Sequence, residues 1–359
     1  MKYINIIHSF PENNHKFKSF CDLTFEINTL QNTYVSNLND VNDVNKYDIV
    51  VIHYLRFEDC RFLSNHDINK PVIWFCWGAD IFSQGKFYNK FLLAKTKLLR
   101  RNLSFKLGLI SGIKQIIKEK TPLSIDCTQI SKNKFETIND KIDYCVPVMP
   151  GDFELIKKNY KLNCKLFHLN YVNPLIQNNS FEEVSGNNIL LGNSSSFTNN
   201  HLEAIDQLSK IDLKSSLVII PLSYGDKHLA TFVADYARKK LGENKVEILD
   251  KFITSSDYNN ILQSCEIMIF NHLRQQAVGN VIQCLLNGSH LYLRKESTVY
   301  QFLKHHNFVI SALNNIRELK RLGKNDIDYN RKKALEVFGA KSQHKKIASL
   351  IEEVMKHNQ

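Results

Sequence analysis

The sequence predicts an α/β fold with two Rossmann-like, doubly wound domains that face a central cleft. Two observations predict this architecture. The chain has 359 residues, which is more than a single hydrophobic core usually holds. Short β-branched runs also alternate with amphipathic stretches from end to end, as in parallel sheets covered by helices. Ligands bind at the carboxyl ends of the strands in such sheets, so polar residues that follow strands are the first candidates for a site.

The expected strands are the short apolar runs between turn residues. In the first half of the chain they are Tyr3–Ile7, Asp48–His53, Val72–Trp77, Leu107–Ile110 and Asp143–Val146. In the second half they are Asn188–Leu191, Ser216–Pro221, Val246–Leu249, Glu266–Phe270, His290–Leu293 and Phe308–Ile310. Stretches such as 227–241 and 297–306 have the spacing of amphipathic helices.

The segment 171–188, YVNPLIQNNSFEEVSGNN, is rich in Asn, Ser and Gly and is the best candidate for an interdomain linker. We therefore expect a first domain over 1–172 and a second domain over 186–322. The remaining tail, 323–359, is charged and helical in pattern. It is a candidate to pack back on the first domain.

The composition is that of a soluble globular protein, with 43% hydrophobic and 23% charged residues. The eight cysteines are all at least sixteen residues apart, which excludes CxxC zinc and redox motifs and indicates a reducing compartment. The N-terminal MKYINIIHSF lacks the length and cleavage site of a signal peptide. No apolar run approaches the ~18 residues that cross a bilayer. We therefore expect a cytoplasmic protein.

The net charge of +11 requires an anionic partner or another explanation. Nucleic acid, an anionic membrane and a phosphorylated substrate all fit this charge. The cations are unevenly spread, because the segment from Ile81 to Lys118 holds nine Lys or Arg residues and no acid.

One unusual apolar run is WFCWGADIF, residues 74–82, which holds both tryptophans, a glycine and a single acid. It is typical of a buried strand that ends at Gly78. Asp80 then has two interpretations: it caps the next helix while the tryptophans fill the core, or it lies at the rim of the cleft as a catalytic carboxylate.

Two further stretches place small polar residues after expected strands. LLGNSSSFTNNHLEAI, residues 190–205, turns at Gly192-Asn193-Ser194 and enters a helix near Asn200. Free N–H groups there favour a phosphate, although an ordinary helix capped by Thr198 or Asn199 gives the same pattern. SLVIIPLSYGDKHLATFV, residues 216–233, brings Tyr224 to the same edge, either to stack on a base or to anchor its own loop.

The most suggestive stretch is IFNHLRQQAVGNVIQCLLNGSHLYL, residues 269–293. A strand leads into His272, Arg274, Gln275 and Gln276, and a helix opens near Ala277. An Arg beside a helix N-terminus favours a diphosphate, and Gln side chains suit ribose hydroxyls or a pyrimidine edge. A polar loop with a solvated Arg is the alternative.

Taken in order, these motifs resemble the bacterial 4-acetamido-4,6-dideoxygalactose (Fuc4NAc) transferases. Those enzymes use a TDP-sugar to complete the lipid-linked repeat of enterobacterial common antigen. The matching pieces are WxxWGAD at 74–80, the GNS…NxH block in 191–201, VxxPxxY at 218–224 and RQQxxG at 274–279. His53, at the end of an expected strand, and the Asn14-His15 pair also fit.

The resemblance implies a GT-B fold, with an N-terminal acceptor domain and a C-terminal domain for the nucleotide sugar. It implies catalytic roles for Asp80, His15 and His53, with Asp80 the first choice as the base. The implied donor-binding residues are Gly192, Asn193, Ser194, Asn199, His201, Tyr224, Arg274, Gln275, Gln276, Gly279 and Asn280. Many GT-B enzymes carry two Glu residues eight apart near the donor helix; here Gln275 and Gln283 stand in their place, which leaves the ribose contact open.

The same resemblance implies no cofactor and no metal. Asp326-Ile-Asp328 spells a DxD motif, but helix capping explains it better. The implied partners are a TDP-sugar, an undecaprenyl-diphosphate-linked saccharide as acceptor, and an anionic membrane surface, with no nucleic acid. The product is then a surface polysaccharide such as common antigen or O-antigen.

The basic segment KFYNKFLLAKTKLLRRNLSFK, residues 86–106, has the pattern of an amphipathic helix. Its cations Lys86, Lys90, Lys97, Arg100 and Arg101 are expected to contact anionic lipid on the cytoplasmic face of the inner membrane. A core helix with a solvated basic face is the alternative. Two other functions remain open at this point: a non-catalytic basic protein that binds a membrane or nucleic acid, and a GT-B-type sugar epimerase.

Overall fold

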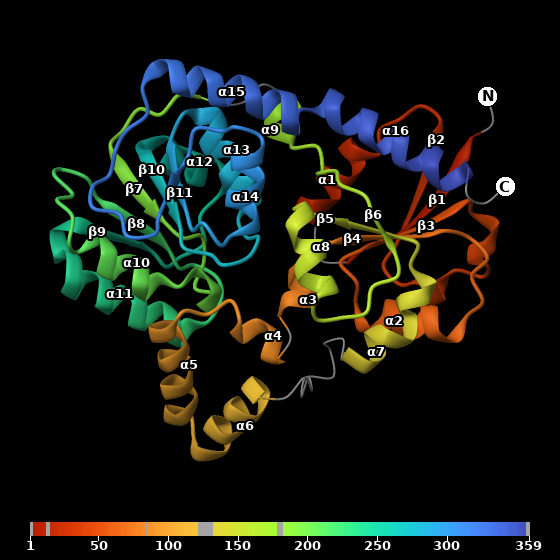
Figure 1. Ribbon diagram of the computed structural model, residues 1–359, viewed down its shortest axis with the longest axis horizontal. Coiled ribbons are helices and arrows are strands. Elements are labelled where there is room, and N and C mark those ends of the chain that lie inside the picture. Colours follow the sequence, from red (N-terminus) through yellow and green to blue (C-terminus); the bar gives the residue numbers. More distant parts are fainter. Residues whose placement is uncertain (1–2, 12–14, 84, 121–131, 178–181, 357–359) are drawn as a thin grey trace. The chain divides into compact units, whose positions relative to one another are not determined.

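The computed structural model describes residues 3–11, 15–83, 85–120, 132–177 and 182–356, and it divides into two compact units (Figure 1). The first unit comprises Met1–Tyr88, Lys120–Asn179 and Glu336–Gln359, and the second comprises Asn89–Glu119 and Ser180–Leu335. Each unit is built around one six-stranded sheet. The two-domain α/β fold expected from the sequence is confirmed.

The first sheet has the strand order β2-β1-β3-β4-β5-β6, and every described pair is parallel. Its strands are β1 Ile4–Ser9, β2 Leu30–Val35, β3 Ile49–His53, β4 Val72–Cys76, β5 Tyr144–Pro147 and β6 Lys165–Leu166. The helices of this unit are α1 His15–Thr24, α2 Phe57–Asn65, α3 Ala79–Phe82, α4 Gly85–Asn89, α7 Lys132–Ile138, α8 Pro150–Lys157, α9 Pro174–Gln177 and α16 Ala340–Lys356.

The second sheet has the order β12-β11-β10-β7-β8-β9 and is also parallel. Its strands are β7 Asn188–Leu191, β8 Val218–Pro221, β9 Val246–Leu249, β10 Cys265–Phe270, β11 His290–Leu293 and β12 Ser311–Ala312. The helices are α5 Ala94–Lys106, α6 Leu109–Lys120, α10 His201–Leu208, α11 Lys227–Leu241, α12 Ser255–Ser264, α13 Val278–Asn287, α14 Thr298–His305 and α15 Lys324–Phe338.

The tail divides between the two units. In α16, Ile347, Leu350, Ile351 and Val354 recur at helical spacing, and all four join the buried core on β1, β3 and β4 of the first sheet. In α15, by contrast, Arg331 donates to the carbonyl of Leu286 in the second unit. The expected return of the tail to the first domain is thus made by α16, not by the whole of 323–359.

The segment Asn89–Glu119 belongs to the second unit, although the expected boundary at 172 places it in the first. The reason is a set of specific contacts with α10. Leu93 N donates to Asn200 Oδ1 at 2.7 Å, and Thr96 gives two hydrogen bonds to the Glu203 carboxylate. Leu99 adds an apolar contact in the second core.

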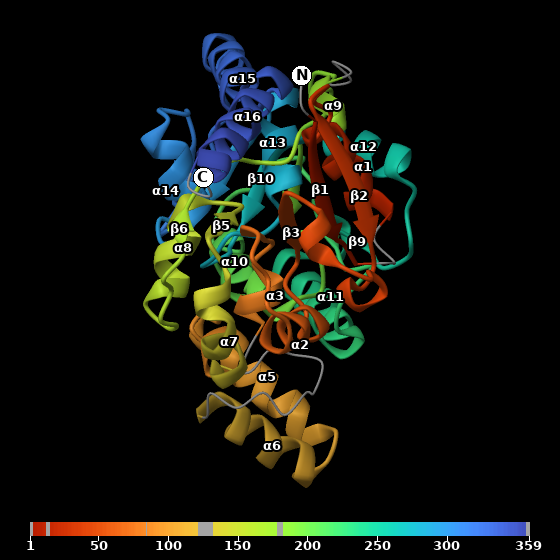
Figure 2. The same cartoon turned by 90° about the vertical axis from the view of Figure 1, so that its right-hand side faces the viewer.

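Two sequence expectations in this basic segment are wrong. Leu107–Ile110 is not a strand: α5 ends at Lys106 and α6 begins at Leu109. The continuous amphipathic helix expected over 86–106 is two helices, α4 and α5. They are separated because Leu93, at the start of α5, is extended with its N–H bonded to Asn200. Figures 1 and 2 show α5 and α6 as a helical hairpin.

Most other expected strands are present within two residues of their predicted ends. Phe308 and Ile310 are buried as expected, but the strand there is Ser311–Ala312. The strands β2 and β6 were not anticipated. No helix among the described residues has the length and apolar character needed to cross a membrane.

Candidate active site

Three loops meet at the carboxyl edge of the second sheet, after β7, β8 and β10. The β7 loop turns at Gly192, the β8 loop turns at Gly225, and the β10 loop leads into α13 through Ala277, whose φ is +57°. Ser195 and Gly225 form a parallel bridge, and Ser195 N donates to the Tyr224 carbonyl at 2.9 Å. Adjacent parallel strands thus deliver polar residues to one place, where ligands bind in such sheets.

Asn199 is the centre of a buried hydrogen-bond network between the first and third loops. Its Oδ1 accepts from the backbone N–H of Asn193 at 3.0 Å and contacts Nε2 of His272 at 2.9 Å. Its Nδ2 donates to the Ser194 carbonyl at 3.0 Å. Since Oδ1 is an acceptor, His272 must carry its proton on Nε2.

The side chain of Asn193 joins all three loops. Its Nδ2 donates to the hydroxyl of Tyr224 at 2.9 Å, and its Oδ1 accepts from Gln276 Nε2 at 3.1 Å. Gln276 also accepts a 2.6 Å hydrogen bond from Thr198 Oγ1. Tyr224 is 61% exposed despite this contact, so its ring face is open to a ligand.

Gly192 is required by the close approach of His201. A Cβ at residue 192 would lie 2.6 Å from His201 Nε2 and 2.8 Å from Asn199 Oδ1, and φ is +73°. His201 is buried, and within the described part of the chain its Nε2 has no hydrogen-bond partner. Burial lowers the pKa of His201 to about 3, so the ring is neutral and presents an unsatisfied nitrogen beneath the loop.

The start of α13 has space for a ligand. A Cβ at Gly279, in the first turn, would meet no atom within 4 Å. Arg274, buried just before this helix, donates from Nη1 to the Gln275 carbonyl at 2.6 Å. Burial lowers the pKa of His272, and the positive charge of Arg274 lowers it further. A cation beside free helix amides suits a diphosphate.

Three further amide side chains lie in α13 or in the loop before it. Asn280 donates to the Tyr258 hydroxyl, and Gln283 donates to Asn259 Oδ1 at 3.0 Å, so both contact α12. Gln275 lies in the loop and is buried. Gln275 and Gln283 therefore do not form a matched pair, because one precedes the helix and the other packs on a neighbouring helix.

Asp80 lies at the carboxyl edge of the first sheet. Gly78, with φ +88°, begins α3, and Asp80 is its second residue rather than its cap. The carboxylate accepts from Trp74 Nε1 at 3.0 Å and from Leu55 N at 3.2 Å. Burial raises the pKa of Asp80 to about 6, with those hydrogen bonds opposing the shift. A carboxyl with this pKa is suited to exchange a proton near neutral pH.

His53 is part of a chain of hydrogen bonds that runs from Trp77 to Asn32. Trp77 Nε1 donates to the Tyr171 hydroxyl at 2.8 Å, which contacts His53 Nδ1 at 2.6 Å. His53 Nε2 contacts His8 Nδ1 at 2.9 Å, and His8 Nε2 contacts Asn32 Oδ1 at 2.9 Å. Because Asn32 Oδ1 accepts, the direction of each bond is fixed, and both histidines are neutral.

This chain of bonds corrects the expectation that His53 contacts the acceptor. His53 is fully buried, and both ring nitrogens are engaged with protein atoms. It holds Tyr171 and Trp77 in place instead. The side chain of His15, the third catalytic candidate, and that of Lys86 lie outside the described part of the structure, as does Asn14.

Several residues near the two edges were not singled out from the sequence as site residues. The sequence named Thr198 only as a possible helix cap and His272 only as part of the stretch 269–293. These two residues complete the second-sheet network, and His8 and Tyr171 complete the first-sheet one. Arg56 lies beside the Leu55 amide that binds Asp80, and it contacts Asp59 and Ser9. The signal was present for His8 and His272, which stand at or directly after the ends of β1 and β10.

Four of the buried histidines, His8, His53, His201 and His272, predict that the fold is labile in acid. Burial lowers the pKa of His8 to about 4 and of His201 to about 3, and it lowers those of His53 and His272 well below 6.5. The unfolded chain therefore binds protons that the native state excludes, and stability falls as the pH drops below about 6.5. The raised pKa of Asp80 has the opposite effect, because it increases stability as the pH falls from about 6 to about 4. This is the contribution of a single group, whereas four histidines lower the stability.

We expect a lower urea midpoint at pH 5 than at pH 7, with a contribution of up to about 2 kcal/mol from each histidine. Unfolding followed by circular dichroism at the two pH values measures this difference. An unchanged or higher midpoint at pH 5 would show that these histidines are protonated in the native state.

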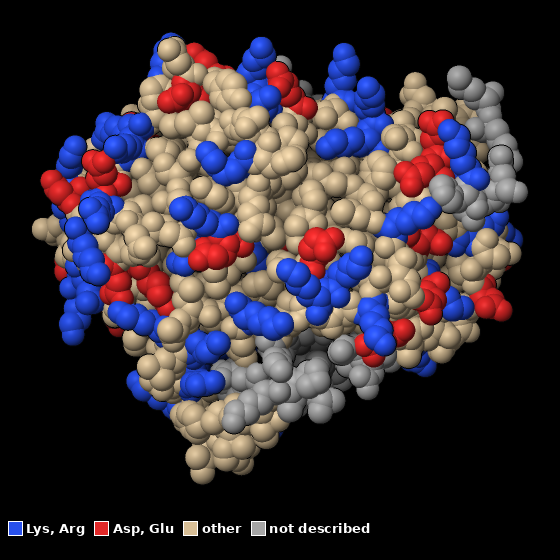
Figure 3. Space-filling view, in the orientation of Figure 1, with Lys and Arg blue, Asp and Glu red and all other residues tan. Residues whose placement is uncertain are grey.

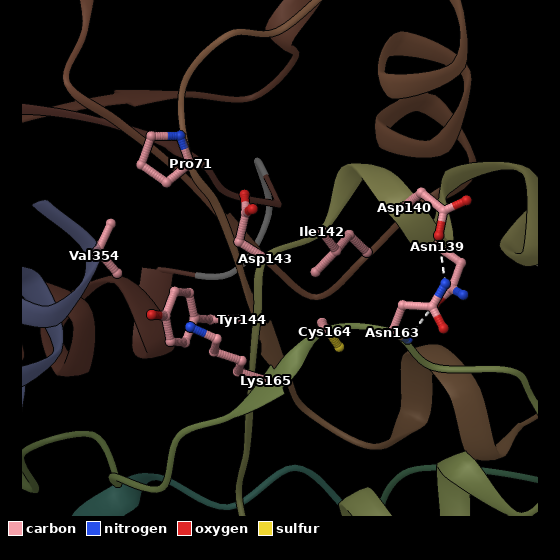
Figure 4. A pocket seen from close by; sticks show the side chains of 10 residues that line it. All are labelled: Pro71, Asn139, Asp140, Ile142, Asp143, Tyr144, Asn163, Cys164, Lys165 and Val354. Carbon is pink, nitrogen blue, oxygen red and sulfur yellow. Dashed lines mark hydrogen bonds between the residues drawn. The ribbon is translucent and has the colours of Figure 1, made fainter. Parts of the chain in front are cut away.

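A cavity of about 300 Å³ lies in the first unit, but at the opposite edge of the sheet from Asp80 (Figure 4). It is lined by Pro71, Asn139, Asp140, Ile142, Asp143, Tyr144, Asn163, Cys164, Lys165 and Val354. Pro71 and Asp143 directly precede β4 and β5, so this is the amino edge. Asp143 there accepts from Val72 N at 2.8 Å, which ties the two strands together.

Within the described residues no cluster of His, Cys, Asp and Glu is arranged to hold a metal. Asp326 lies in the first turn of α15, and Asp328 is 3.7 Å from Arg331 in an i,i+3 ion pair. The DxD sequence is therefore part of a helix start. Both acids lie inside α15, so neither is its N-cap.

Residues 148–318 match the family described as 4-alpha-L-fucosyltransferase glycosyl transferase group 56. The matched region covers the strands and loops of the second sheet from β7 to β12. It contains the GNS, PxxY and RQQ motifs, so the family resemblance stated from the sequence is confirmed.

Solved structures with the same fold cover the whole chain. A structure of Anabaena Alr3699/HepE in complex with UDP and glucose aligns with 98% of this chain and 100% of its own, at TM-score 0.58 and 9% identity. Sucrose-phosphate synthase from Thermosynechococcus elongatus aligns over 99% and 100%, at TM-score 0.58 and 7% identity. A glycosyltransferase from Rickettsia africae aligns over 99% and 100%, at TM-score 0.54 and 10% identity.

At these identities the similarity establishes the fold, and the group 56 match establishes the class of enzyme. A non-catalytic basic protein and an epimerase are accordingly set aside. The chain is a glycosyltransferase with a GT-B fold, and its residues 148–318 carry the sequence signature of the 4-alpha-L-fucosyltransferase family, group 56.

Proposed function

We propose that this glycosyltransferase transfers a 4-acetamido-4,6-dideoxyhexose, Fuc4NAc or a close relative, from a TDP-sugar to an undecaprenyl-diphosphate-linked saccharide in surface polysaccharide synthesis. The observation that carries the donor half is the network around Asn199, with the free His201 nitrogen below Gly192. The ordered sequence motifs support the particular sugar and nucleotide. The lipid-linked acceptor follows from the same resemblance.

The donor diphosphate is assigned to the start of α13 and the loop after β7. Arg274 supplies a full positive charge, and the helix amides near Gly279 supply partial ones. The open ring face of Tyr224 is suited to stack on thymine. Gln275 and Gln276 are assigned to ribose or base edges, because amides both donate and accept. Ser194 shapes the loop through its carbonyl, which binds Asn199.

The reaction breaks the bond between the anomeric carbon and the diphosphate oxygen, and the leaving diphosphate takes the electron pair. An acceptor hydroxyl forms the new bond and gives up its proton. Asp80 is the proposed acceptor of that proton, since a pKa near 6 keeps it mostly ionised at pH 7. Arg274 stabilises the negative charge that develops on the leaving group.

A lipid-linked acceptor implies work at the cytoplasmic face of the inner membrane. The basic segment supports this location, and Lys90, Lys97 and Arg101 are at least partly exposed. Arg100 is less suited to lipid, because it donates to Asn89 Oδ1 and lies 5.8 Å from the Phe197 ring.

The donor prediction is tested by thermal unfolding with a panel of nucleotides. TDP should raise the melting temperature most, and at a hundredfold excess over its Kd the native state should gain about 2.7 kcal/mol. The same panel as nucleotide sugars, with a soluble saccharide acceptor, then identifies the transferred sugar. No shift with any nucleotide at millimolar concentration would contradict a donor site here, and release of free sugar without transfer would contradict the proposed acceptor.

A further inference from the structure

Exposed apolar side chains are concentrated on the α5–α6 hairpin. Of the thirteen large apolar or tyrosine side chains that are exposed within the described residues, seven lie between residues 98 and 117. They are Leu98, Phe105, Leu107, Leu109, Ile110, Ile113 and Ile117. A cluster of this kind on a soluble chain marks a surface that binds something apolar.

The apolar side chains of α6 lie on one face. Leu109, Ile110 and Ile113 recur at helical spacing and are 70%, 71% and 47% exposed. Ile117 continues the face one turn further and is 45% exposed. Leu107, in the turn before α6, is 60% exposed and extends the same surface to the tip of the hairpin.

Cations flank this apolar surface. On α5, the side opposite the buried Leu99 carries Lys97 and Arg101, one turn apart, beside Leu98 and Phe105. No acid occurs from Ile81 to Lys118. In the view of Figure 3, the lowest point of the molecule shows neither positive nor negative groups, and blue side chains lie above it.

Specific contacts join α5 to α6 and join the hairpin to α10. The Phe105 ring lies against Gly112, where a Cβ would be 2.1 Å from Cδ1 of the ring, so a larger residue at 112 would displace the ring. The base of α5 is fixed to α10 by Asn200 and Glu203. The apolar surface is therefore held at a fixed position on the unit that carries the donor loops.

We propose that the α5–α6 hairpin docks this enzyme on an anionic lipid bilayer by inserting the apolar face of α6, while Lys97 and Arg101 bind lipid headgroups. This inference rests on the proposed lipid-linked acceptor. It differs from contact by the basic residues alone, because the apolar side chains then supply binding that salt does not screen. The charge pattern selects an anionic bilayer over a second copy of this chain, since two such basic hairpins repel each other.

The test compares two variants for binding to phosphatidylcholine vesicles with about one third phosphatidylglycerol. In Leu109→Gln/Ile110→Gln/Ile113→Gln, the helix former Gln replaces the apolar face. In Lys97→Glu/Arg101→Glu, the flanking charge is reversed. At about 0.1 M NaCl both should bind at least ~10-fold more weakly than wild type. At about 1 M NaCl, where the Debye length is about 3 Å, wild type and the charge variant should bind alike and the Gln variant should not bind.

The matched control is Phe252→Gln/Tyr329→Gln, which removes side chains 90% and 42% exposed elsewhere on the second unit and should bind like wild type. Equal vesicle binding by the Gln variant and wild type, or no wild-type binding, would overturn the proposal. So would a wild-type dimer without lipid that the Gln substitutions abolish. Transfer to a soluble acceptor and stabilisation by TDP should survive in the Gln variant, which separates a failure of docking from a failure of the proposed function.

Discussion

Asp80→Asn is expected to lower turnover by about 10²-fold or more, the usual scale for loss of a general base. Affinity for the donor nucleotide should be unchanged, because Asp80 belongs to the first sheet and the assigned donor residues to the second. The amide Oδ1 of Asn can still accept from Trp74 Nε1 and Leu55 N, so the local structure should persist. Turnover, nucleotide affinity and melting temperature are measured on one preparation.

The pH dependence gives a second, independent signature of the same residue. With the pKa of Asp80 raised to about 6, kcat/KM should rise through that pH as the base ionises, and the Asn variant should lack this limb. Stability should respond in the opposite sense. The raised folded-state pKa costs up to about 3 kcal/mol once the carboxyl ionises, and that cost is absent in the neutral variant.

Asp152→Asn is the matched control, since Asp152 is also buried, follows the neighbouring strand β5 and accepts from Met149 N at the start of α8. The amide oxygen of Asn can still accept from Met149 N, so this variant should keep wild-type turnover. Near-normal turnover in Asp80→Asn would assign Asp80 a structural role in joining β4 to the Leu55 loop. His15 would then be the remaining candidate for the base, because both nitrogens of His53 are engaged.

The fold could be predicted from the sequence where burial on both faces made strands apolar after their first residue. Asn188–Leu191 and His290–Leu293 are of this kind, and their predicted bounds agree with the structure. The strand Leu30–Val35 was missed because it is the half-exposed edge of its sheet and carries Gln31, Asn32 and Thr33. The predicted strand Leu107–Ile110 is wrong because this apolar run is exposed to solvent. An apolar run alone does not reveal whether it faces a core or solvent.

The loops that form the candidate site could be predicted from the sequence, but the contacts between their side chains could not. Strand ends pointed to Asn193 and to the segment from Arg274 to Gln276, since parallel strands deliver their carboxyl ends to one edge. The hydrogen bond between Asn199 and His272 joins residues that are 73 positions apart, and the spacing of residues within each stretch does not predict it. The roles of buried residues such as His201 also depend on desolvation, which a sequence does not display.

Arg274→Ala is expected to weaken TDP binding by about 10²-fold and to lower kcat/KM by at least as much. A hydrogen bond to a charged group contributes about 1.5–3 kcal/mol, and a guanidinium that meets a diphosphate also neutralises charge on the leaving group. Isothermal calorimetry with TDP and with thymidine separates the two parts of the ligand. Only TDP should lose affinity, because thymidine has no phosphate for Arg274 to contact.

The control for this variant is Arg331→Ala, because Arg331 lies in α15 and contacts the C-terminal end of α13. Arg331 is also largely buried and donates from Nε to the Leu286 carbonyl at 2.8 Å. Its loss removes a cation that contacts the C-terminal end of α13 and leaves the loop before the helix unchanged, so it should reduce stability while TDP affinity stays intact. Two results would contradict this role: Arg274→Ala binds TDP like wild type, or both variants lose affinity for TDP and thymidine to the same extent. In either case Arg274 only packs against the helix, and the diphosphate binds elsewhere. Because that guanidinium is buried, a loss confined to TDP would mean that its charge is held there for the phosphates.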